Sequence, residues 1–257
     1  MEAKDRIEYI RKWILDYVES MDKPANCLVV GVSGGIDSSV VSTICAMTGM
    51  KTLVASMPIS QRPEHHDLSI KHKNWLTSKY QNAYGVEIDL TGTYLSFENS
   101  MTDKKFTESL GFANSKARLR MMTLYQISAS TSGIVVGTGN KIEDFGVGFY
   151  TKYGDGGVDI SPIADLYKTE VWQLGRDLGI DQRIIDAQPT DGLWEDGRTD
   201  QDQLGGLSYE QMERAMQLDD LNALAVGPEV ESLEKYRELR AKNLHKMQPI
   251  PVFKKKR

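Results

Sequence analysis

The chain has 257 residues, of which 40 % are apolar and 26 % charged, a composition typical of a globular protein and unlike that of disordered or fibrous chains. Its formal net charge of −5 provides no overall basic field to attract nucleic acid, so an anionic ligand must be held by local groups. The length allows one or two domains, and we favour a single domain over residues 1–257.

The first half of the chain alternates between helical and strand patterns. Apolar residues at positions 7, 10, 14 and 17 predict an amphipathic N-terminal helix rather than a signal peptide. Continuous apolar runs predict strands, and helical periodicity predicts the helices between them. The predicted strands cover 27–32, 52–57, 86–90 and 133–136, and the helices cover 36–47, 64–80 and 114–130. This order predicts an α/β fold, a doubly wound, mostly parallel, Rossmann-like sheet with helices on both faces.

The second half is less regular. Residues 160–166 form an extended or turn segment, and 168–178 predict a helix that ends at Gly179. Residues 189–206 are rich in Asp, Gly, Thr and Gln, which predicts a long loop of the kind that serves as a lid. Two helices, 209–218 and 229–243, follow, and the basic run 254–257 is typical of a solvated tail.

The cysteines and histidines do not indicate a metal centre. Cys27 and Cys45 lie in apolar patterns without metal-ligand spacing, and we expect reduced, buried thiols. His65, His66 and His72 have no accompanying carboxylates or cysteines, and we expect them on a helix surface. No stretch reads as a transmembrane segment, so the cytoplasm is the default location.

The strongest local signal is the segment GVSGGIDSS, between the first predicted strand and the next helix. Paired glycines let the backbone bend and bring N–H groups against an anion, and the helix start adds partial positive charge. The alternative is an ordinary glycine turn whose Asp and Ser cap a helix. The candidate phosphate-binding residues are Gly31, Ser33, Gly34, Gly35, Ile36, Asp37, Ser38 and Ser39.

Asp37 distinguishes this loop from a Walker A loop. The segment lacks the lysine that follows the glycines of a Walker A motif, and a carboxylate at position 37 would repel phosphate unless a cation intervened. Hard divalent cations on nucleotides take one or two carboxylates together with phosphate oxygens. The sequence therefore predicts Mg²⁺ at Asp37.

The string SGGIDSS resembles the pyrophosphate loop (PP-loop) of the N-type ATP pyrophosphatases, whose fold is adenine nucleotide alpha-hydrolase-like. That superfamily includes NAD synthetases, GMP synthetases, asparagine synthetases and tRNA-modifying enzymes. Its members cleave ATP between the α and β phosphates, so this resemblance implies adenylation without fixing the acceptor.

Further segments resemble the ammonia-dependent NAD synthetase family and extend the likeness over nearly the whole chain. They are NSKARLRM at 114–121, GTGNKIE at 137–143, FYTKYGDGG at 149–157, LYKT at 166–169 and QPTDGL at 188–193. At the end of the chain, His245-Lys246 resembles a family H-K-R string, with Met247 in place of the last basic residue.

The resemblance implies a role for each matched residue. The residues implied to contact ATP, beside the loop itself, are Arg120, Thr138, Lys168 and Thr190. Those implied to contact deamido-NAD are Asn114, Arg118, Lys152, Asp155, His245 and Lys246. Asp37 and Glu143 would hold Mg²⁺, and with Lys168 they form the implied catalytic set. Gly139 and Asn140 vary within the family and receive no role.

The implied reaction amidates deamido-NAD with ammonia and ATP through an acyl-adenylate, giving NAD, AMP and pyrophosphate. The resemblance also implies a homodimer that binds deamido-NAD at the subunit boundary. The net charge and the lack of a transmembrane pattern predict no nucleic-acid and no membrane partner. Because 257 residues leave no room for an amidase domain, we expect free ammonia, although a separate glutaminase subunit stays open. The alternatives are another N-type ATP pyrophosphatase acting on a purine nucleotide or tRNA base, and a non-catalytic nucleotide-binding protein.

Overall fold

Four parallel strands form the central sheet of the computed structural model, which describes residues 3–61, 63–194 and 196–255. They are β1 (Cys27–Gly31), β2 (Thr52–Ser56), β3 (Ala83–Glu87) and β4 (Gly133–Val135), in the order β3-β2-β1-β4. The predicted parallel sheet is confirmed. β3 begins three residues before its predicted start, and the N–H groups of Ile88 and Leu90 continue the pairing beyond it, to Ser56 O and Pro58 O.

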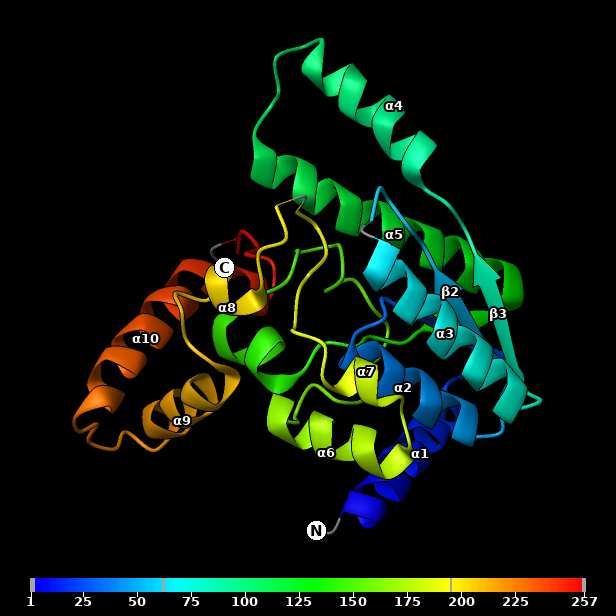
Figure 1. The fold of residues 1–257 in the computed structure, drawn as a ribbon, viewed down its shortest axis with the longest axis horizontal. Coiled ribbons are helices and arrows are strands. Elements are labelled where there is room, and N and C mark those ends of the chain that lie inside the picture. The colour runs from blue at the N-terminus through cyan, green and yellow to red at the C-terminus, as the bar shows by residue number, and fades with distance from the viewer. Residues whose placement is uncertain (1–2, 62, 195, 256–257) are drawn as a thin grey trace.

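Helices cover both faces of this sheet (Figure 1). Because successive strand residues point to opposite faces, Val54 and Ala55 of β2 lie in different apolar clusters. The cluster around Val54 includes α1 (Ala3–Ser20), α2 (Ile36–Met47), α3 (Pro63–Lys79) and α6 (Lys168–Leu178). The cluster around Ala55 includes α4 (Thr91–Thr102) and α5 (Ser109–Thr131). The predicted two-sided α/β arrangement is therefore present.

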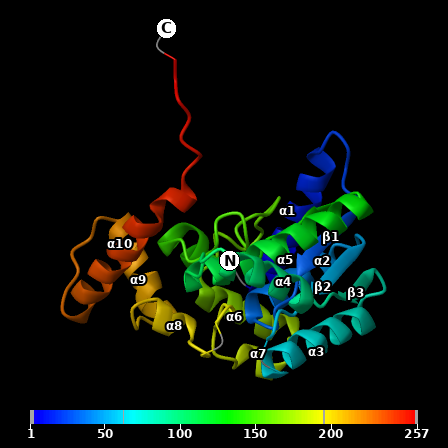
Figure 2. The same ribbon diagram turned by 90° about the horizontal axis from the view of Figure 1, so that it is seen from above.

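The C-terminal part packs beside the sheet as a helical hairpin. It consists of α9 (Tyr209–Asp220) and α10 (Pro228–Met247), which share an apolar cluster with the π-helix η1 (Ile142–Val147). Two short helices, α7 (Gln182–Ile185) and α8 (Asp200–Gln203), precede the hairpin, and α8 lies inside the predicted loop 189–206. Beyond α10, residues 248–255 lead away from the body of the molecule (Figure 2).

His72 corrects the expectation that the histidines lie on a helix surface. Its side chain is 2 % exposed, and its Nε2 lies 2.8 Å from Ser42 Oγ, because α3 packs this residue against α2. His66 is only partly exposed, and the side chain of His65, like residues 256–257 of the basic tail, lies outside the described residues.

Both cysteines are free and buried, as expected. Over the described part of the chain, none of the helices has the length and apolar character needed to cross a membrane.

Candidate active site

A cavity of about 470 Å³ opens where the chain leaves the carboxyl ends of β1 and β4. These neighbouring strands flank the point where the strand order reverses, which is where doubly wound sheets bind ligands. Most predicted site residues line it. They are Gly31, residues 33–38 of the loop, Asn114, Arg120, Thr138, Glu143, Asp155, Lys168, Thr190 and Lys246.

The loop from Gly31 to Ser39 is shaped by one glycine and braced by serine hydroxyls. Gly34 has a φ of 89°, a left-handed conformation that side chains disfavour. Ser38 Oγ and Ser39 Oγ both donate to Gly35 O, at 3.1 and 2.9 Å. Ser39 is fully buried, so it supports the loop from beneath. The first N–H groups of α2, which lack intrahelical acceptors, begin at this loop.

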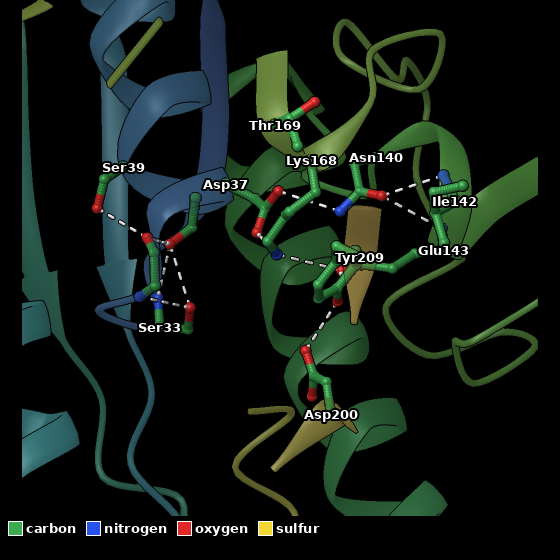
Figure 3. Close-up of polar contacts among 12 residues, drawn as sticks. Ser33, Asp37, Ser39, Asn140, Ile142, Glu143, Lys168, Thr169, Asp200 and Tyr209 are labelled. Atoms are coloured by element: carbon green, nitrogen blue, oxygen red, sulfur yellow. Dashed lines mark hydrogen bonds and ion pairs between the residues drawn. The ribbon is translucent and has the colours of Figure 1, made fainter. Parts of the chain in front are cut away.

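Three charged side chains meet beside this loop, and we call Asp37, Glu143 and Lys168 the charged centre. Lys168 Nζ lies 2.5 Å from Asp37 Oδ2 and 3.3 Å from Glu143 Oε1 (Figure 3). The side chains are 3 % exposed for the lysine and 16 % for each carboxylate. Burial alone would lower the pKa of Lys168, but the carboxylates of Asp37 and Glu143 raise it above its ordinary value. The lysine is therefore a buried ammonium ion.

The three members come from separate elements. Asp37 lies in the first turn of α2, Lys168 is the first residue of α6, and Glu143 lies in η1. Single π-helical turns of the η1 type are frequent at functional sites. The structure thus brings together the three residues that the family resemblance implies as the catalytic set.

Asn140 is a site residue to which the sequence analysis gives no role. It is fully buried, and its Nδ2 donates to Asp37 Oδ1 at 3.2 Å. Its Oδ1 accepts from the N–H groups of Ile142 and Glu143, at 3.1 and 3.2 Å. One amide therefore ties the start of η1 to Asp37. The signal was present, since Asn140 lies inside the matched string GTGNKIE, but its variation within the family hid it.

Tyr209 and Asp200 extend the charged centre and were not predicted. Tyr209 Oη lies 2.7 Å from Glu143 Oε1 and 2.9 Å from Asp200 Oδ2. Burial, and next the nearby Glu143 carboxylate, raise the pKa of Asp200 to about 7. Burial likewise raises the pKa of Glu143. Neither Tyr209 nor Asp200 lies in a segment that resembles the family, so the sequence carried no signal for these two residues.

The electrostatics of the centre favour a divalent cation. Two carboxylates, those of Asp37 and Glu143, face the single ammonium of Lys168, beside a loop built for anions. Phosphate cannot approach this excess negative charge without a counter-ion. No cluster of three or more His, Cys, Asp or Glu within residues 3–61, 63–194 and 196–255 has metal-binding geometry. Two carboxylates are what Mg²⁺ bound to a nucleotide commonly takes from a protein, so Asp37 and Glu143 are the residues that could hold such a cation together with substrate oxygens.

Arg120 offers an unused donor to the cavity. Its Nε donates to Met57 O at 3.0 Å, whereas Nη2 is buried and has no hydrogen-bond partner in the described part of the chain. Desolvation lowers the pKa of Arg120 to about 10, with a partial offset from Asp155 and Asp191, so the guanidinium stays charged. A buried unpaired donor is rare, and an anionic ligand would satisfy it.

Asn114 and Asp155 also line the cavity, and Thr151 connects them. Thr151 Oγ1 donates to Asn114 Oδ1 at 2.7 Å, and the Thr151 N–H donates to Asp155 Oδ1 at 3.0 Å. Asp155 opens to the cavity, yet desolvation by the surrounding protein raises its pKa to about 6.

Three predicted substrate residues do not line the cavity, and they lie together outside it. The exposed Arg118 guanidinium donates to Lys152 O through Nε and Nη2, at 3.4 and 3.3 Å. Lys152 Nζ donates in turn to His245 O at 3.0 Å. Lys246 turns inward instead, and its Nζ donates to Gly148 O and Tyr150 O. The predicted deamido-NAD residues are thus divided between the cavity and its surroundings.

Comparisons with known proteins identify a family for this chain. The family model described as NAD synthase matches residues 6–256. The NH₃-dependent NAD⁺ synthetase of Mesoplasma florum is 37 % identical, covering 93 % of this chain and 94 % of that protein. The enzyme of the same name from Methanosarcina acetivorans is 37 % identical, covering 98 % and 97 %.

Two solved structures share the fold. The NMN synthetase of Francisella tularensis has a TM-score of 0.84 and 30 % identity, with 98 % of each chain covered. The NH₃-dependent NAD synthetase of Campylobacter jejuni, in complex with nitrate, has a TM-score of 0.80 and 23 % identity. That match covers 99 % of this chain and 100 % of the other.

Proposed function

The chain belongs to the NAD synthase family, and from this premise we propose that it is an ammonia-dependent NAD synthetase. It amidates deamido-NAD with ammonia at the expense of ATP, giving NAD, AMP and pyrophosphate. The observation that carries the proposal is one cavity in which the phosphate loop, the charged centre and the unused donor of Arg120 converge.

In the first step, a carboxylate oxygen of deamido-NAD attacks the α-phosphorus of ATP. The new O–P bond forms as the bond to the bridging oxygen breaks, and that oxygen leaves with its electron pair as pyrophosphate. The loop N–H groups, Arg120 Nη2 and the Lys168 ammonium are the donors available to the phosphates. These donors hold the two anionic substrates together against the repulsion between their negative charges.

In the second step, the nitrogen of ammonia attacks the acyl carbon of the adenylate. The C–O bond to AMP breaks, AMP leaves with the electron pair, and the nitrogen gives up one proton to complete the amide. No protein nucleophile is needed. We assign Asn114 and Asp155 to deamido-NAD, because the family resemblance links them to it and both side chains line the cavity, connected by Thr151.

We also propose Mg²⁺ as the cofactor, held by Asp37 and Glu143. When bound, it supplies positive charge that neutralises the phosphates and polarises the attacked phosphorus. The excess negative charge of the centre supports this assignment. Asn140 donates a hydrogen bond to Asp37, and Lys168 donates to both Asp37 and Glu143, so the two carboxylates already lie close together before a ligand binds.

The test is a reaction with purified protein, ATP, deamido-NAD, ammonium chloride and Mg²⁺, followed by chromatography of AMP and NAD. We expect equal amounts of the two products, and neither product when any one component is left out. AMP release without deamido-NAD would favour another ATP pyrophosphatase. Binding of ATP without turnover would favour the non-catalytic alternative.

A second candidate substrate follows from the likeness to the NMN synthetase of Francisella tularensis. The same chemistry applied to nicotinate mononucleotide would give NMN. Arg118, Lys152 and His245, which the resemblance links to deamido-NAD, lie outside the cavity and leave its interior to the reacting part of the substrate. Comparing kcat/KM for the two acids decides between them, and we expect the dinucleotide to be preferred.

We further propose that the protein is a homodimer. Large apolar side chains are exposed on α4, α5 and the turn between them, a set that we call the α4–α5 apolar face. It consists of Leu95, Phe97, Phe106, Leu110 and Met122. α4 also stands away from the body of the molecule (Figure 1). Exposed apolar patches of this kind mark association surfaces.

Two other expectations from the sequence stay predictions. One is that residues 1–257 act as a single domain, and the other is a cytoplasmic location. The apolar cluster that α9 and α10 share with η1 supports the first, since it joins the C-terminal hairpin to the segment that carries Glu143.

A further inference from the structure

A phenol from the C-terminal hairpin reaches the charged centre. Tyr209, the first residue of α9, is buried, and its hydroxyl lies 2.7 Å from Glu143 Oε1. Its ring also lies against Lys168, whose Nζ is 4.7 Å from the ring centroid. One side chain therefore contacts two members of the centre, the carboxylate from η1 and the ammonium from α6 (Figure 3).

Asp200 approaches the same hydroxyl from the opposite side, with Oδ2 at 2.9 Å. The Tyr209 oxygen therefore lies within hydrogen-bond distance of two carboxyl groups, one from η1 and one from α8. The three groups thus form one hydrogen-bonded row. Asp200 Oδ1 is buried and has no hydrogen-bond partner among the residues that the structure describes.

The backbone of Asp200 connects this row to the long loop. Its N–H donates to Pro189 O at 2.9 Å and so joins the two ends of the segment 189–200. Thr190 follows directly within that segment and lines the cavity, as Asp200 does. Asp200 therefore connects the closure of this loop to the hydroxyl that contacts Glu143.

We propose that Tyr209, oriented by Asp200, is a positioning residue that holds the Glu143 carboxylate against Lys168 and presets the centre for Mg²⁺ and ATP. The proposal rests on the proposed function. Its rival is a plain packing role, since the Tyr209 ring also meets Trp172 edge to face, with centroids 6.1 Å apart. Packing needs the ring, whereas positioning needs the hydroxyl.

Tyr209→Phe separates the two roles because it removes only the hydroxyl. Calorimetry would measure Mg²⁺ affinity in the presence of an ATP analogue with a methylene bridge between the α and β phosphates, and steady-state kinetics would give kcat and KM. Loss of a hydrogen bond to a charged group should weaken Mg²⁺ binding roughly tenfold and lower kcat by at least about that factor. The KM for deamido-NAD should stay within about twofold, because this change leaves the contacts of Asn114 and Asp155 with Thr151 in place.

Tyr236→Phe is the matched control. Tyr236 is another fully buried tyrosine of the C-terminal hairpin, on α10, and it does not line the cavity. Its variant should keep the wild-type Mg²⁺ affinity and kcat, whatever it does to the melting temperature. A Tyr209→Phe variant that matches wild type in both quantities would leave only the packing role and overturn the proposal.

Asp200 is tested by a double-mutant cycle. Asp200→Ala should weaken Mg²⁺ binding in the same direction, and the combination with Tyr209→Phe should lose no more than the worse single variant, because Asp200 acts through the hydroxyl. Fully additive losses would refute that link. If Tyr209→Phe does not fold, as judged by circular dichroism, Asp200→Ala alone carries the test and should weaken Mg²⁺ binding, because it removes the group that orients the hydroxyl.

Failure of the proposed function gives a different result. A wild-type protein that forms neither NAD nor NMN but binds Mg²⁺ with the ATP analogue, and loses that affinity in Tyr209→Phe, refutes the reaction and keeps the positioning role. A wild-type protein that turns over, with a variant that equals it, refutes the positioning role alone.

Discussion

Loss of a carboxylate and loss of the lysine from the charged centre should change the free energy of unfolding by different amounts. Removing Lys168 would leave Asp37 and Glu143 facing each other, both largely buried, without a counter-charge. Removing the charge of Asp37 would leave Lys168 still paired with Glu143. Breaking a buried ion pair is costly mainly when it leaves an uncompensated charge. Stability and activity should therefore respond differently to the two changes.

Asp37→Asn should abolish turnover and destabilise the fold by only about 1–2 kcal/mol, because the amide can accept from Asn140 or from Lys168 but not from both, while it relieves carboxylate repulsion. Lys168→Met should abolish turnover and also destabilise the fold by roughly 3–5 kcal/mol. Urea unfolding followed by circular dichroism, beside the NAD assay, measures both. Equal destabilisation by the two variants would contradict the expected difference between Asp37 and Lys168.

Some site residues can be recognised from the sequence around them, and others cannot. Asp37 was predictable, because a carboxylate between a strand, a glycine turn and a helix has few other uses. Lys168 and Glu143 needed the family resemblance, since a lysine at a helix start is common. Tyr209 and Asp200 could not be predicted, because their role comes from tertiary contacts across 66 and 9 residues of sequence.

At the level of elements, the contact between α2 and α3 is sensitive to acid. His72 of α3 is buried beside Ser42 of α2, and burial lowers the pKa of His72 from 6.5 to about 4. Between these pH values the unfolded chain binds a proton that the folded chain does not. The contribution of His72 to the free energy of unfolding is therefore fully present above pH 6.5 and is lost as the pH falls towards 4.

His72→Gln should remove this pH dependence, because an amide can still reach Ser42 but does not titrate. We expect the wild-type protein to lose roughly 3 kcal/mol more than the variant between pH 6.5 and 4. Urea unfolding at a series of pH values gives the difference. If the free energy of unfolding changed with pH in the same way for both proteins, His72 would bind its proton equally well in the folded and the unfolded chain.

Elements with a strong pattern and a clear end were predicted well. α2 and α6 have the predicted bounds, and Gly179 ends α6 in the left-handed conformation, with φ at 72°. α4 was missed, because only Tyr94 among its residues is buried and an exposed helix has little apolar periodicity. In α1, Tyr17 is 38 % exposed and Val18 is buried in its place, a one-residue error in the apolar face.

At the level of the whole molecule, the position of the substrate residues connects the site to assembly. Arg118 lies on α5, the helix that also carries part of the α4–α5 apolar face. Arg118, Lys152 and His245 form a contact chain outside the cavity, where a second subunit could complete a binding surface. Dimerisation should therefore matter for deamido-NAD more than for ATP.

The combined change Phe97→Glu and Phe106→Glu should make the protein monomeric, because it places two carboxylates within the apolar surface that a partner would bury. Sedimentation velocity should show a dimer dissociation constant raised by at least about 100-fold. The monomer should have a higher KM for deamido-NAD and unchanged affinity for the methylene-bridged ATP analogue with Mg²⁺. Leu224→Glu, at an 86 % exposed apolar site between α9 and α10, should leave the dimer intact. A dimer that survives the double change would place the interface elsewhere.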